Sequence, residues 1–111
     1  MIYLASPYSS PSEKVMQRRY DAACRAVADH IVLGYVIYSP ILNSHPLRKY
    51  DVPGDWKFWA SVDLEFLVCC DELWVLTLPG WRKSVGVAEE IRQAREWDIP
   101  ITYVEPRGEM R

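Results

Sequence analysis

Short apolar runs alternate along this chain with longer segments of helical periodicity, and that alternation restricts the fold more than any other feature. The β-prone runs are "IYLAS", "YVIYSPIL", "ELWVLTL" and "ITYVEP", at residues 2–6, 35–42, 72–78 and 101–106. The segments between them that suit a helix are about residues 12–33, 56–69 and 85–97. A β-α-β-α-β-α-β order is typical of a parallel sheet with helices on both faces. We therefore expect a doubly wound α/β fold of about four to five strands, with all 111 residues in one domain.

The ends of the first helix carry recognisable signals. Ser10 or Ser12 could cap it, and Pro11 suits its first turn. Gly34 is placed to end it. Ligands of such folds bind beyond the carboxyl ends of the strands. The loops expected at that edge are residues 6–12, 43–55, which include His45, and 79–86.

Composition excludes several classes of protein. The formal net charge is −2 and the basic residues are scattered, so the sequence lacks the concentrated positive charge of a nucleic-acid-binding surface. Binding of a free nucleotide or another small ligand remains open. The first ten residues lack the regions of a signal peptide, and no apolar run approaches the ~18 residues of a membrane span. Cys24, Cys69 and Cys70 are odd in number and two are adjacent, which argues against a disulfide framework or a zinc site. We expect a cytoplasmic protein that binds neither nucleic acid nor membranes.

The stretch "KSVGVAEEI" at residues 83–91 contains two adjacent glutamates, and helical geometry separates their environments. A helix turns by about 100° per residue, so an apolar stripe of Val87, Ile91 and Ala94 would define its buried face. Glu90 lies about 60° to one side of that stripe, whereas Glu89 points away from it. Glu90 is therefore the expected cleft residue, and Glu89 the solvated one.

Asp63 falls inside an apolar stripe rather than opposite it. The stripe consists of Trp56, Ala60, Leu64 and Leu67. Burial of an unpaired carboxylate is costly, so we expect Asp63 to be hydrogen-bonded, protonated or at the mouth of a pocket. The same helix carries a second apolar row, formed by Phe58, Val62, Phe66 and Cys69. This row favours a homodimer packed through residues 56–69; a thicker core is the alternative.

Ser84 and Gly86 stand where the last helix begins. The free N–H groups and the dipole of a helix start can bind an anion, and glycine lets a ligand approach the backbone closely. The alternative is that Ser84 only caps the helix and that the early glutamates only complement its dipole.

The string "SVGVAEEI" fits S-x-G-V-x-x-E-[LI] and resembles the catalytic segment of 2'-deoxynucleoside 5'-monophosphate N-glycosidases, within the nucleoside 2-deoxyribosyltransferase-like superfamily. "YLASP" is similar to the opening strand of these enzymes, and "DLEFLVCCDELWVL" to the segment that carries an aspartate before their central strand. The segments "HPL" and "PGWRKS" resemble uncharacterised bacterial and phage proteins near the superfamily. The resemblance implies a Rossmann-like hydrolase or transferase that cleaves the N-glycosidic bond of a deoxynucleoside or deoxynucleotide.

The resemblance also implies roles for individual residues. Glu90 takes the place of the nucleophile, Ser84 that of the serine that holds a 5'-phosphate, and Asp63 that of the aspartate near the sugar and base. Tyr3 and Ser6 lie where the first strand lines the pocket, followed by Tyr8 in the next loop.

This chain departs from the family pattern at several positions. The segment "PYSSPSE" replaces a Gly- and Arg-rich loop, so Arg19, Arg82 or Lys83 would have to supply the cation. Val87 replaces the threonine of the transferases, and Arg92 a glycine. The serine-bearing version of the motif fits better than the version found in the transferases.

The chemistry expected of these positions is an oxocarbenium-like cleavage that needs no metal or cofactor. Glu90 would act beneath the anomeric carbon and Asp63 would protonate the leaving base. His45 could contact the base or phosphate, or have no role, and Trp56, Trp59 and Trp81 could stack on a base or belong to the core or an interface. Two other functions remain open: a non-catalytic nucleotide-binding or sensing module, and a metal-dependent phosphate-ester hydrolase.

Overall fold

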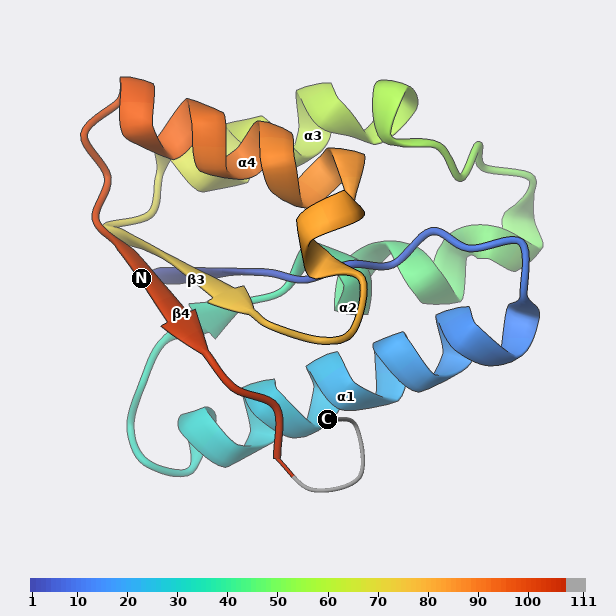
Figure 1. Cartoon of the computed structure of the whole chain (residues 1–111), viewed down its shortest axis with the longest axis horizontal. Helices are drawn as coiled ribbons and strands as arrows, with labels where there is room; N and C mark the ends of the chain where they lie inside the picture. Colours follow the sequence, from blue (N-terminus) through green and yellow to red (C-terminus); the bar gives the residue numbers. More distant parts are fainter. Residues whose placement is uncertain (108–111) are drawn as a thin grey trace.

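The computed structural model describes residues 1–107 and contains a four-stranded parallel sheet (Figure 1). The strands are β1 (Ile2–Ala5), β2 (Ile37–Tyr38), β3 (Glu72–Leu76) and β4 (Ile101–Val104), in the order β2-β1-β3-β4. All neighbours are parallel, with Tyr3 beside Tyr38 on one side and Leu73 on the other. The α/β parallel architecture expected from the alternation of elements is confirmed.

Helices cover both faces of the sheet. The helix α1 (Glu13–Ile31) lies below it, and α3 (Trp56–Val68) and α4 (Val85–Glu96) lie above it in Figure 1. Successive residues of a strand point to opposite faces, so Leu4 packs in the core beside α1 and Tyr3 in the core beside α3 and α4. All four residues of β1 are buried, which explains why this strand is apolar throughout rather than alternating.

The ends of α1 follow the local sequence. The Oγ of Ser12 accepts a hydrogen bond from the N–H of Val15 (3.3 Å), while the Oγ of Ser10 accepts one from the N–H of Ser12 (3.1 Å). Ser12 is therefore the cap, and Pro11 precedes it instead of occupying the first turn as we expected. At the other end, Gly34 has a φ of 96°, a conformation that side chains disfavour.

The second strand is much shorter than the expected 35–42. Only Ile37 and Tyr38 pair with β1, because Pro40 begins a short helix, α2 (Pro40–Ser44). Proline suits the first turn of a helix but has no N–H to donate to a sheet. A 3₁₀ helix, η1 (His45–Tyr50), follows directly, so most of the expected loop 43–55 is helical. The strands β3 and β4 also end two residues earlier than predicted, and a 3₁₀ turn, η2 (Trp81–Lys83), precedes α4.

The second apolar row of α3 is largely exposed, although Phe66 stacks on Tyr38 of β2, with ring centroids 4.3 Å apart. Phe58 and Phe66 are 44% and 40% exposed, and Cys69 is also exposed, whereas Leu67 on the first row is fully buried. Between them, Val62 is half-buried.

Among residues 1–107, no helix has both the length and the apolar character that crossing a membrane requires.

Candidate functional site

A cavity of about 390 Å³ lies at the carboxyl ends of β1 and β3. The chain leaves β1 toward β2 on one side and returns in β3 on the other, so the cavity sits at the topological switch point, where ligands of such folds bind. Its volume falls within the range of roughly 300–1,000 Å³ found for small-molecule sites. All three loops expected at this edge contribute to its wall. The lining residues are Ser6, Tyr8, Ser9, Arg19, Pro40, Ile41, Ser44, Arg48, Val52, Pro53, Gly54, Asp55, Trp56, Trp59, Asp63, Gly80, Lys83, Ser84, Val85, Gly86 and Glu90.

Besides the exposed Asp55, two buried carboxyl groups line this cavity, one from each helix above the sheet. Asp63 of α3 is 7% exposed and Glu90 of α4 is 4% exposed. The inward orientation that helical geometry predicted for Glu90 and Asp63 is confirmed. Glu89 remains 42% exposed and forms a 3.0 Å ion pair with Arg92, as expected for the solvated neighbour.

Burial shifts the proton affinity of both acids. Loss of solvation raises the pKa of Asp63 to about 7. Loss of solvation, together with the nearby charge of Asp63, raises the pKa of Glu90 to about 8, although a hydrogen bond from Tyr3 opposes the rise. The charges of these two carboxyls therefore interact, and the pair changes protonation close to neutral pH.

Tyr3 supports Glu90 from beneath the cavity. Its hydroxyl donates a hydrogen bond to Oε2 of Glu90, and its ring is fully buried in the core between β1 and α4. Tyr3 is not among the lining residues, so it contacts Glu90 rather than the open space. Desolvation and the two acids raise the pKa of Tyr3 well above its usual value, so the phenol keeps its proton and remains a donor.

Two polar atoms at the cavity wall are buried and have no hydrogen-bond partner within residues 1–107. These atoms are Oγ of Ser6, at the end of β1, and Oδ1 of Asp63. A buried polar group without a hydrogen bond costs roughly 1–3 kcal/mol. Both groups would regain a partner from a polar ligand in the cavity.

Ser84 and Gly86 both line the cavity at the start of α4. Ser84 caps the helix, since its Oγ accepts a hydrogen bond from the N–H of Val87 (3.2 Å). Its own hydroxyl hydrogen is left to donate elsewhere. A Cβ on Gly86 would lie 3.3 Å from Cε3 of Trp56, so this glycine also makes room for the Trp56 indole.

Arg19 lines the cavity but its guanidinium mainly joins two loops. Nη1 donates to the carbonyls of Tyr8 (3.3 Å) and Ser9 (2.9 Å), and Nη2 donates to that of Pro79 (3.2 Å). A Cβ on Gly80 would lie only 2.7 Å from Nη2. Arg19 therefore holds the loop after β1 against the loop after β3.

The other candidate cations separate into two groups. Lys83 lines the cavity, and none of residues 1–107 is a hydrogen-bond or ion-pair partner of its ammonium. Arg82 instead stacks over Trp81, 4.7 Å from the ring centroid, and neither residue belongs to the lining. Trp56 and Trp59 do form part of the wall, and Nε1 of Trp59 donates to the carbonyl of Pro53 (2.7 Å).

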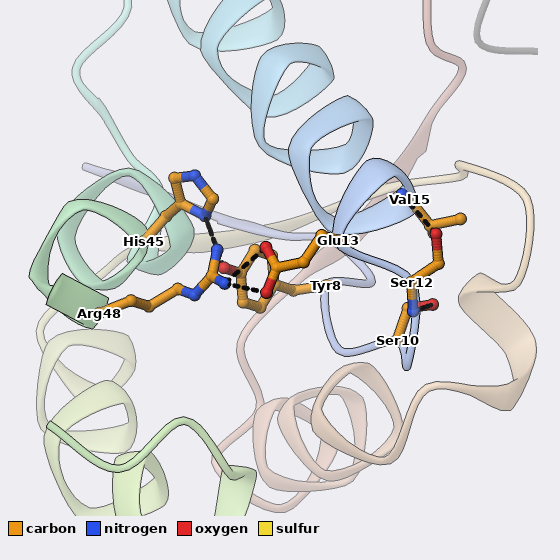
Figure 2. Close-up of polar contacts among 7 residues, drawn as sticks. All are labelled: Tyr8, Ser10, Ser12, Glu13, Val15, His45 and Arg48. Carbon is orange, nitrogen blue, oxygen red and sulfur yellow. Dashed lines mark hydrogen bonds and ion pairs between the residues drawn. The ribbon is translucent and has the colours of Figure 1, made fainter. Parts of the chain in front are cut away.

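His45 lies behind the cavity wall rather than in it. Its Nδ1 is 2.5 Å from the hydroxyl of Tyr8 and 3.3 Å from Nη1 of Arg48, as Figure 2 shows. Its ring also stacks on Tyr20, with centroids 4.1 Å apart. His45 thus orients Tyr8, a lining residue.

Sequence reasoning missed Arg48 as a site residue. Arg48 lines the cavity three positions after His45, within the 3₁₀ helix η1. Residues three apart lie on the same side of a 3₁₀ helix. The sequence signal that could have revealed Arg48 is the pair Pro40 and Pro46, because proline is common at the start of a helix. A helical start at these prolines would have placed the side chains of His45 and Arg48 on one face.

Among residues 1–107, no group of three or more His, Cys, Asp or Glu residues is arranged to hold a metal ion.

Comparison with known proteins assigns the chain to a family. No curated protein matches the chain. The model of one protein family, described as "Domain of unknown function (DUF1937)", matches residues 1–105. Because that match covers nearly the whole chain, the protein belongs to the DUF1937 family.

Proposed function

We propose that this protein cleaves the N-glycosidic bond of a deoxynucleoside 5'-monophosphate or deoxynucleoside, with Glu90 as the nucleophile. The observation that carries the proposal is the pair formed by Glu90 and Asp63. Two buried acids from different helices line one cavity at the carboxyl edge of the sheet, and one oxygen of Asp63 has no hydrogen-bond partner in the described part of the chain. Glycosidic cleavage uses two carboxyl groups beside the scissile bond.

The two walls of the cavity suit different parts of such a ligand. Lys83, the Ser84 hydroxyl and the first N–H groups of α4 offer positive charge and donors for a phosphate. Trp56, Trp59 and Ile41 offer apolar surface for a base. A sugar that joins the two would lie over Glu90 and Asp63.

In the first step, the carboxylate of Glu90 attacks the anomeric carbon while the bond from that carbon to the base nitrogen breaks. The electron pair of the broken bond goes to the base, which takes a proton from Asp63. Positive charge develops on the sugar, and the carboxylate beneath it stabilises that charge. The products are a free base, an ionised Asp63 and a sugar ester of Glu90.

In the second step, water attacks the anomeric carbon of the ester and gives its proton to Asp63. The bond between the sugar and Glu90 breaks, and the carboxylate is regenerated. If a second base attacks in place of water, the reaction becomes a transfer of the sugar. The same two acids serve both outcomes, because only the attacking group differs.

This mechanism requires a proton on Asp63 and none on Glu90. With pKa values of about 7 and about 8, the proton of a singly protonated pair lies more often on Glu90 than on Asp63. The hydrogen bond from Tyr3 favours the ionised form of Glu90, and the cationic transition state favours it further.

The test is release of free base from the four deoxynucleoside monophosphates and the four deoxynucleosides, followed by chromatography. We expect release by the wild-type protein and a loss of at least about 100-fold in Glu90→Gln. Glu89→Gln is the matched control, because it removes the neighbouring, solvated carboxylate, and it should retain activity. The proposal fails if no substrate releases base, or if Glu90→Gln releases it as fast as the wild type.

A non-catalytic nucleotide-binding module is the second candidate, and the raised pKa values favour it. With a pKa of about 8, Glu90 carries a proton in most molecules at neutral pH, which suits a hydrogen-bond donor better than a nucleophile. This function predicts that deoxynucleotides raise the melting temperature while no base is released.

A further inference from the structure

One wall of the cavity is built from a chain of polar contacts between the loop after β1, α1 and η1. Arg48 holds both carboxylate oxygens of Glu13 through Nη2, at 2.5 and 2.7 Å, and its Nη1 reaches His45 (Figure 2). The hydroxyl of Tyr8 reaches the same Nδ1 of His45, at 2.5 Å. Of these four residues, Tyr8 and Arg48 line the cavity.

The donors around His45 determine the direction of each bond. A guanidinium only donates hydrogen bonds, so the Nδ1 that faces Arg48 must be the acceptor. His45 is therefore neutral, with its proton on Nε2. Burial and the charge of Arg48 lower the pKa of His45, which favours the same neutral form.

The consequence for Tyr8 is that its only proton is already used. The phenol donates to Nδ1 of His45, and burial raises the pKa of Tyr8, so it keeps that proton at neutral pH. Its oxygen also accepts a hydrogen bond from Arg48, and its remaining lone pair can only accept from a ligand. Arg48 itself has five N–H donors, of which Glu13, His45 and Tyr8 occupy part. The wall thus presents an acceptor beside a donor.

The order of the strands separates this wall from the start of α4. Tyr8 and His45 meet on the β2 side of β1, whereas Lys83 and Ser84 follow β3 on the opposite side. The two walls also differ in charge. Glu13 neutralises Arg48, while none of residues 1–107 forms an ion pair with Lys83, or with Arg19, whose guanidinium joins the Tyr8 loop to the loop after β3. A ligand with one anionic and one neutral end would place its anion near Lys83 and its neutral end near Tyr8.

We propose that Tyr8, fixed as an acceptor by His45 and Arg48, selects a base that carries an exocyclic amine next to a ring nitrogen. An aminopurine or aminopyrimidine edge presents an N–H donor beside a nitrogen acceptor, which complements Tyr8 and Arg48. A base with a carbonyl and a ring N–H presents the reverse pattern. Its carbonyl oxygen, an acceptor, would then face the oxygen of Tyr8, which is also an acceptor. The inference rests on the proposed function for the orientation of the ligand, and it adds the class of base.

The experiment compares two ligands that differ at this edge. Binding of deoxyadenosine monophosphate and deoxyinosine monophosphate is measured by calorimetry on the wild type and on Tyr8→Phe. The wild type should bind the amino ligand at least about tenfold more tightly, because the wrong edge leaves a polar group unpaired. Tyr8→Phe should lose most of that preference. Tyr20→Phe is the matched control, since it keeps the ring that stacks on His45 and lies outside the lining.

Each outcome decides the inference separately from the reaction. A wild-type preference that Tyr8→Phe abolishes and Tyr20→Phe retains supports the inference, even if no base is released and the proposed function fails. Equal binding of the two ligands by the wild type overturns it, as does an equal loss of both in Tyr8→Phe. Failure of both ligands to bind overturns it together with the proposed function. If Tyr8→Phe does not fold, the wild-type ratio alone decides.

Discussion

Tyr3 and Glu90, which are 87 positions apart in the sequence, form a buried hydrogen bond between the first strand and the last helix. The phenol donates and the carboxyl oxygen accepts, so the bond favours the ionised form of Glu90. Tyr3 also places the carboxyl group over the carboxyl edge of the sheet. Glu90, which lines the cavity, is thus oriented by a residue outside the lining.

Tyr3→Phe should raise the pKa of Glu90 further above its value of about 8, because the hydrogen bond from Tyr3 lowers that pKa. The titration of Glu90 can be followed by NMR of isotopically labelled glutamate. If base release is detected, the pH at which activity rises should shift upward in the variant. The control is Tyr103→Phe, which alters an exposed tyrosine on β4. An unchanged titration of Glu90 would contradict the role given to Tyr3.

The stability of the protein should decrease as the pH rises from about 4 to about 8. The pKa values of Asp63 and Glu90 are about 7 and about 8 in the folded state, against 3.8 and 4.5 as their ordinary values. The folded state therefore binds more protons across this range, and the free energy of unfolding decreases as those protons are lost. Urea denaturation at a series of pH values measures this slope.

Asp63→Asn should remove part of that slope. The amide carries no charge, so at pH 8 the variant should be more stable than the wild type, by on the order of 2 kcal/mol. Below about pH 3 the two proteins should differ little, because Asp63 is mostly protonated in both states there. Glu89→Gln, which changes a solvated carboxylate, should keep the wild-type slope. A lower stability of Asp63→Asn at pH 8 would show that the charge of Asp63 is compensated in the fold.

Gly80→Ala should destabilise the protein more than Gly34→Ala. The two glycines have nearly the same φ, 91° and 96°, so an alanine at either position costs about 1–2 kcal/mol from backbone strain. A Cβ at Gly34 meets nothing within 4 Å, whereas one at Gly80 would displace the guanidinium of Arg19. The difference between the two variants in urea denaturation therefore measures the Arg19 contacts. Equal losses would indicate that Arg19 moves aside without cost.

We also propose that the exposed apolar row of α3 packs against a second copy of the chain, as the sequence suggested. Phe58 and Phe66 expose 44% and 40% of their surface on one face of that helix. Phe58→Glu should convert a dimer to a monomer in sedimentation velocity, because a charge would be buried in the contact. Lys57→Glu, an adjacent exposed position, should leave the dimer intact. A wild-type protein that sediments as a monomer at all concentrations would exclude this contact.

Local patterns were sufficient for much of the fold and for the orientation of the central acids. The alternation of elements predicted the parallel sheet, and the 3.6-residue period placed Glu90 and Asp63 on buried faces. Ser84 was identified as a cap from its place before α4. These features depend on residues close together in the chain, so their physical causes are visible in the sequence.

The sequence did not reveal how segments distant from one another meet. β2 is cut short because Pro40 begins a helix, and that helix leads to η1, which carries Arg48 to the cavity. His45 was expected as a possible ligand contact and instead orients Tyr8 from behind the wall. Arg19 was considered as a cation for a phosphate, yet its guanidinium joins two loops through their carbonyls.

The sequence by itself determined the order of the main strands and helices and which faces of the long helices are buried, because helix caps and periodicity act over a few residues. Only the tertiary structure decided which polar groups share the cavity and which of them lack a partner. That outcome follows from the strand order β2-β1-β3-β4, which brings the loops after three strands to one edge. Contacts such as Tyr3 with Glu90 form across this edge and within the core, where spacing along the chain carries no information about distance.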